Sequence, residues 1–139
     1  MRYWDASALV ALCVEEGTTD SMRTLARATR IVTWGLSQVE VASAIERRTR
    51  EGALGEAQRE IALQGLSTLA RAWTEVTALT TVRDHALHVL ARHPLRAADA
   101  MQLAAALVAS SERPAGHEFV CSDERLRAAA RREGFRILP

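Results

Sequence analysis

Four acidic residues stand alone in apolar or small-residue stretches of this 139-residue chain. Asp99 is the most unusual, because the sequence from Ala97 to Val108 is so apolar on every side that a helix formed from it is expected to be buried. An ionised carboxylate is costly to bury unless it is paired, hydrogen-bonded or bound to a metal ion. The nearest basic residue, Arg96, could satisfy Asp99 by itself. However, the same pattern recurs at Asp5, Glu40 and Asp123, so we expect one shared site.

Short strands alternate with helices along the chain. Segments rich in β-branched or aromatic residues predict strands at 2–4, 31–34, 73–76, 118–121 and 135–138. Apolar periodicity and capping residues predict helices at 7–14, about 19–28, 37–50, 54–72, 82–92, after Pro94 to about 111, and 123–133. This alternation is typical of an α/β fold, with a parallel sheet covered by helices on both faces. The length fits a single domain, 1–139.

The predicted elements place the four acids at similar positions. Asp5 and Asp123 follow directly on strands, Glu40 lies in the first turn of the helix after a strand, and Asp99 lies near the start of its helix. In open parallel sheets, ligands bind in the crevice at the carboxyl ends of the strands. We therefore expect all four acids to line that crevice.

Each acid also has a purely structural interpretation. Ser37 and Glu40 have the spacing of a capping box, in which serine and glutamate satisfy backbone donors at a helix start. Asp5 and Asp123 could be simple N-caps of the helices that follow them. If Pro94 occupies the first turn of its helix, Asp99 is too deep to cap. The joint pattern of four acids at one sheet edge favours a site.

Such a site predicts metal-dependent phosphodiester hydrolysis. Three or four oxygen ligands without Cys or His select Mg²⁺ or Mn²⁺ over zinc. One ion would activate water, and a second would stabilise the leaving oxygen. Ser7 and Ser122 are expected to orient the carboxylates or bind a phosphate, and Arg96 and Arg125 to contact substrate phosphates at the rim. The chain is therefore a nuclease candidate.

Composition excludes several other classes of protein. All 18 basic residues are arginine, so no mechanism that needs a catalytic lysine is possible. The net charge of +1 gives no global attraction to nucleic acid. No stretch predicts a membrane span or a signal peptide, so we expect a cytoplasmic protein with Cys13 and Cys121 as buried thiols. Histidines at 85, 88 and 93, on or beside one helix, are better explained as solvated side chains than as a metal site.

Four motifs carry a resemblance that spans nearly the whole chain. They are Asp5-Ala6-Ser7-Ala8-Leu9-Val10, Val39-Glu40-Val41, Ala98-Asp99-Ala100 and Val120-Cys121-Ser122-Asp123-Glu124-Arg125-Leu126. In order and spacing these motifs resemble the signatures of PIN-domain ribonucleases, and the short length and the ending Gly134-Phe135-Arg136-Ile137 resemble the VapC toxins of bacterial toxin-antitoxin pairs.

The resemblance implies a three-layer α/β/α sandwich with a central parallel sheet and Mg²⁺- or Mn²⁺-dependent endoribonuclease activity. It also implies a homodimer and a protein antitoxin that blocks the groove. It assigns metal binding to Asp5, Glu40, Asp99 and Asp123. Two alternatives stay open, which are a PIN-type nuclease that matures RNA or acts on DNA, and a PIN fold used only for binding.

Overall fold

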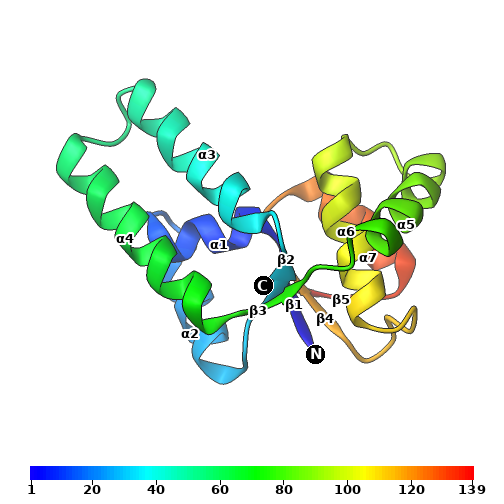
Figure 1. Ribbon diagram of the computed structural model, residues 1–139. Coiled ribbons are helices and arrows are strands. Elements are labelled where there is room, and N and C mark those ends of the chain that lie inside the picture. Colours follow the sequence, from blue (N-terminus) through cyan, green and yellow to red (C-terminus); the bar gives the residue numbers. More distant parts are fainter.

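A computed structural model describes all residues from 1 to 139 (Figure 1). Five short strands form one sheet: β1 (Arg2–Trp4), β2 (Val32–Trp34), β3 (Thr74–Val76), β4 (Glu118–Val120) and β5 (Arg136–Leu138). Seven helices connect them: α1 (Ala6–Cys13), α2 (Thr19–Ala28), α3 (Ser37–Arg50), α4 (Glu56–Ala72), α5 (Leu79–Arg92), α6 (Ala97–Ala109) and α7 (Glu124–Glu133). None of the helices is both long and apolar enough to cross a membrane.

All neighbouring strands are parallel, in the order β3-β2-β1-β4-β5. Tyr3 at the centre of β1 lies opposite Val32 on one side and Phe119 on the other. The chain first builds outward from β1 through β2 to β3, then crosses back to add β4 and β5 on the other side of β1. The direction of winding therefore reverses between β1 and β4, which is where parallel sheets open a crevice at their carboxyl ends.

Helices cover both faces of the sheet, α1 to α4 on one and α5 to α7 on the other (Figure 1). Side chains that alternate along each strand supply two cores. Tyr3 and Phe119 stack at 5.3 Å on the side of α5 to α7, whereas Trp4 and Val120 pack with the helices of the opposite face. The predicted α/β class and three-layer arrangement are confirmed.

Several predicted boundaries were wrong by a few residues. Helix α5 begins at Leu79 instead of 82, and α4 begins at Glu56 instead of 54. The predicted all-round burial of the Asp99 helix is confirmed from Ala100 to Leu107, apart from the partly buried Met101. It was wrong at the start of the helix, where Ala97 and Ala98 are exposed. Both cysteines are free thiols, as predicted, although only Cys121 is fully buried.

Candidate active site

One pocket of about 590 Å³ lies at the carboxyl edge of the sheet and collects the predicted acids. Asp5 enters it from the end of β1 and Asp123 from the end of β4. Glu40 comes from the first turn of α3 and Asp99 from the first turn of α6. The lining also includes Ser7 and Ser122. Strand ends that share one edge therefore bring these six residues together, and their roles in catalysis stay predictions.

Asp5 is the most deeply buried of the four acids, with 3% of its surface exposed. Its carboxylate caps α1 by accepting from the Ser7 amide at 3.0 Å, and it also accepts from the Ser7 hydroxyl and the Cys121 thiol. The Ser7 hydroxyl in turn accepts from the Ser122 amide at 3.0 Å. Burial raises the pKa of Asp5 despite these hydrogen bonds. Ser122 thus joins the network through its backbone.

Glu40 is partly buried, and its environment disfavours the ionised form. Burial raises the pKa of Glu40 to about 7, and the charges of Asp5 and Asp99 add to that rise. The only hydrogen bond to its carboxylate comes from the Gln102 side chain, at 3.0 Å, and this bond opposes the rise. The negative charges of Asp5, at the end of β1, and Asp99, on α6, therefore disfavour ionisation of Glu40.

The environment of Asp99 also disfavours its ionised form. Burial raises its pKa, and the charges of Asp5 and Asp123 raise it further, while the nearby Arg96 lowers it. The structure gives Asp99 no hydrogen bond and no ion pair within 4.0 Å. Arg96 therefore does not satisfy this carboxylate, and the four acids form one mutually repelling set.

The capping-box interpretation of Ser37 and Glu40 was wrong. The cap position of α3 is Leu36, without a side-chain bond, and the Ser37 hydroxyl faces Thr33 and Gln102 instead. Asp5 and Asp123 do cap α1 and α7, while they also line the pocket. Asp99 lies in the first turn of α6, because the helix begins at Ala97 and not at Pro94.

Two arginines that the sequence argument missed also line the pocket, Arg47 and Arg48 of α3. Arg48 forms an ion pair with Glu16 at 2.9 Å, whereas Arg47 is exposed and forms none. Arg47 follows Glu40 by two helical turns, so the i, i+7 spacing could have revealed it. Arg96 and Arg125 are exposed and lie outside the pocket lining.

The donor set of the pocket fits a divalent cation in type and charge. Carboxylates are the oxygen ligands that Mg²⁺ and Mn²⁺ prefer, and a cation would offset the like charges that add to the raised pKa values of Glu40 and Asp99. As the side chains stand, no three of them converge on a point that would hold an ion. Asp5 is fully buried, Glu40 and Asp99 are partly buried, and Asp123 is exposed.

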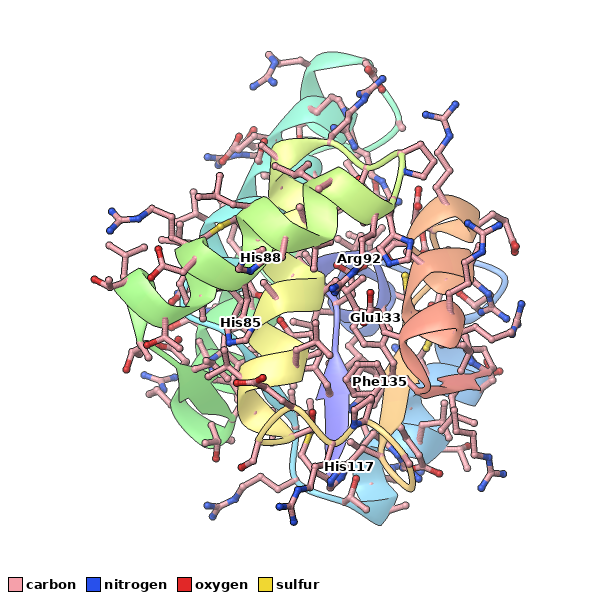
Figure 2. The ribbon with its side chains drawn as sticks, turned by 90° about the vertical axis from the view of Figure 1, so that its right-hand side faces the viewer. His85, His88, Arg92, His117, Glu133 and Phe135 are labelled. Atoms are coloured by element: carbon pink, nitrogen blue, oxygen red, sulfur yellow. The ribbon has the colours of Figure 1, made fainter.

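His85 and His88 lie elsewhere, on the face of α5 shown in Figure 2. His85 contacts Glu112 at 3.3 Å, and His93 contacts Glu133 of α7 at 2.6 Å. Arg92 reaches the same Glu133 at 2.9 Å (Figure 2). These pairs tie α5 to α7 and to the loop before β4, which supports their interpretation as structural or solvated side chains.

Comparison with known families decides the classification of the fold. The family model described as PIN domain matches residues 2–132. The chain is a PIN-domain protein. Two relatives are Ribonuclease VapC45 of Mycobacterium tuberculosis (strain CDC 1551 / Oshkosh) and Ribonuclease VapC49 of Mycobacterium tuberculosis (strain ATCC 25618 / H37Rv). Each is 32% identical to this PIN domain over 146 aligned positions, which cover 99% of the chain and 94% of the relative.

The family predicted from four short motifs is therefore confirmed, as is the likeness of this PIN domain to VapC ribonucleases.

Proposed function

We propose that this PIN domain is a metal-dependent endoribonuclease that hydrolyses RNA phosphodiester bonds as the toxin of a toxin-antitoxin pair. The observation that carries the proposal is the set of four acids in one pocket, with the pKa values of Asp5, Glu40 and Asp99 all raised. Relatives named as VapC ribonucleases support the choice of RNA as substrate.

In this proposal Asp5, Glu40, Asp99 and Asp123 hold Mg²⁺ or Mn²⁺. When bound, the cation supplies activation of water and neutralisation of the charge that develops at the phosphate. The Ser7 hydroxyl and amide keep the Asp5 carboxylate facing the pocket, because both donate to it. The Ser122 amide holds Ser7 in place and so links the loops after β1 and β4. Arg47 supplies positive charge on the α3 side for a substrate phosphate.

The reaction makes a direct prediction about products. Purified protein is expected to cleave RNA with Mg²⁺ or Mn²⁺ and to leave 5′-phosphate and 3′-hydroxyl ends, because water attacks in line at the phosphorus. Sequencing of the cleaved ends, with a parallel reaction in EDTA and a DNA of the same sequence, tests it. Cleavage that persists in excess chelator, or 2′,3′-cyclic ends, contradicts the mechanism, and preferential cutting of DNA favours the alternative substrate.

Replacement of Arg47 by alanine is expected to weaken RNA binding by roughly threefold to tenfold and to leave Mn²⁺ affinity unchanged. A lost contact between arginine and a single-stranded phosphate also lowers the slope of log K against log salt by about 0.7. Arg96→Ala and Arg125→Ala test the rim contacts predicted from the sequence in the same titration. Arg71→Ala, an exposed α4 arginine without an ion pair, is the matched control. Equal salt slopes in all four variants would show that these arginines are solvated surface residues that do not contact RNA phosphates.

The partners follow from the same proposal. We propose a protein antitoxin that blocks the acid pocket, and a homodimer. RNA as substrate supports a cytoplasmic location.

Co-expression with the neighbouring gene separates the toxin from the other candidates. A toxin is expected to arrest growth alone and not with its antitoxin. A maturation nuclease or a non-catalytic binding module would show no such rescue.

A further inference from the structure

We propose that Gln102 is a positioning residue that holds the Glu40 carboxylate in its place in the acid pocket. It does so as the centre of a buried polar chain formed by Tyr3, Thr33, Ser37 and Gln102. This role rests on the proposed function, since it matters only if Glu40 is a metal ligand.

The buried polar chain is entirely shielded from solvent, because all four of its residues have no exposed surface. Gln102 lies on α6 between Asp99 and a run of alanine and leucine residues. A buried amide costs free energy unless both its oxygen and its nitrogen find partners. An apolar side chain at this position would avoid that cost, so the amide needs a reason beyond packing.

The contacts of Gln102 give it one orientation. The Tyr3 hydroxyl donates to Gln102 Oε1 at 2.6 Å. The two hydrogens on Nε2 then point to Ser37 Oγ and to Glu40 Oε1, each at 3.0 Å. A flipped amide would place its oxygen against the carboxylate of Glu40, and two acceptors repel. The carboxylate of Glu40, which only accepts, therefore selects the orientation in which Gln102 donates to it, and the Tyr3 hydroxyl holds the amide oxygen on the other side.

The other end of the buried polar chain is anchored on the backbone of β1. Thr33 Oγ1 lies 2.7 Å from both the Trp4 carbonyl oxygen and Ser37 Oγ. The single hydroxyl proton of Thr33 goes to the carbonyl, which only accepts, so the Ser37 proton is the one shared between the two hydroxyls. Ser37 then accepts from Gln102. The chain thus connects Glu40 to the residue immediately before Asp5, across β1, β2, α3 and α6.

A positioning role and a purely structural role predict different results. If the buried polar chain only stabilises the fold, its loss lowers the melting temperature and leaves the metal affinity of the folded protein unchanged. If Gln102 positions Glu40, its loss weakens metal binding specifically through Glu40. Partners in contact with metal ligands typically contribute about 10- to 100-fold to metal affinity or activity.

The test measures Mn²⁺ affinity by calorimetry on the full chain without RNA, at a temperature where circular dichroism shows every variant folded. Gln102→Met keeps the length of the side chain and removes its donors, and we expect roughly 10- to 100-fold weaker binding. Tyr3→Phe removes the donor to Gln102 Oε1 and leaves the amide less firmly held, with an expected loss of roughly 2- to 10-fold. This second variant keeps the proposal testable if Gln102→Met does not fold. Val89→Ala, a core change on α5 away from the pocket, is the control for general destabilisation.

A double-mutant cycle with Glu40→Gln identifies the path of the effect. We expect the loss caused by Gln102→Met to vanish when Glu40 is already replaced, and KM for RNA at saturating Mn²⁺ to stay within about twofold of wild type. Independent, additive losses overturn the positioning role, as does wild-type affinity in folded Gln102→Met and Tyr3→Phe. Wild-type affinity in Glu40→Gln alone overturns the metal site of the proposed function, and the role of Gln102 with it.

Discussion

Replacement of Asp99 by asparagine is expected to lower RNA cleavage by roughly 10²- to 10⁴-fold, yet to leave the metal-free protein at least as stable as wild type. The loss of activity follows from the removal of one anionic oxygen ligand from the proposed metal site. Asparagine is nearly isosteric with aspartate, so the packing of α6 is retained.

The expected sign of the stability change comes from the raised pKa of Asp99. A carboxyl whose pKa is higher in the folded than in the unfolded protein binds its proton more tightly when folded. Its contribution to the free energy of unfolding therefore falls as the pH climbs past the unfolded value of about 3.9, and the fall ends above the folded pKa. At pH 7 the ionised Asp99 opposes folding, and the neutral amide removes that penalty.

A structural acid would give the opposite result. If Asp99 were held by Arg96 or by backbone donors, asparagine would destabilise the fold by about 1–3 kcal/mol. Thermal melts in EDTA at pH 7, beside a cleavage assay with Mn²⁺, separate the two cases. Asp84→Asn, an exposed acid on α5 without an ion pair, controls for the general effect of removing a negative charge. An Asp99→Asn protein that is less stable and still cuts RNA would refute the proposed site.

The order of the elements could be predicted from the sequence because each strand is a short β-branched or aromatic segment between helical stretches. The boundaries were harder where propensity and tertiary structure disagree. Thr80 and Thr81 are β-branched and weak helix formers, so the helix was predicted to begin at 82 and its first turn was missed. In the structure that turn is helical, as the backbone bond from the Val82 amide to the Ala78 carbonyl shows. Tertiary context thus overrides a local preference there.

The gathering of the four acids was predictable because parallel strands end at one edge of the sheet. The residues that surround the acids were not, because their contacts depend on how helices face one another. Gln102 is one polar residue in an apolar helix, and only the tertiary fold brings its side chain within 3.0 Å of Glu40 on α3. Arg96 and Arg125 are close to acids along the chain, but neighbours two or three residues apart do not necessarily share a direction. Arg47, seven residues from Glu40, does lie on the face that lines the pocket.

The metal-free protein is expected to lose stability as the pH rises from about 4.5 to 7, and Glu40→Gln is expected to lose less. Glu40 has an ordinary pKa of 4.5, and burial raises it to about 7 in the folded chain. Over most of that interval the folded protein holds this proton while the unfolded chain releases it, so the free energy of unfolding falls with pH. The full difference corresponds to about 3 kcal/mol at 1.36 kcal/mol per pH unit, and solvent at this partly exposed carboxyl reduces it to about 1–2 kcal/mol.

Urea unfolding in EDTA at several pH values between 4.5 and 7.5 measures this dependence for wild type and Glu40→Gln. Equal pH slopes for the two proteins would contradict the raised pKa of Glu40. The same series with excess Mn²⁺ is expected to show the opposite slope, because the cation binds ionised carboxylates and competes with their protons, so its stabilisation grows as the pH rises. A slope that changes sign with Mn²⁺ in wild type, and much less in Glu40→Gln, would identify the repulsion among these acids as the cost that metal binding relieves.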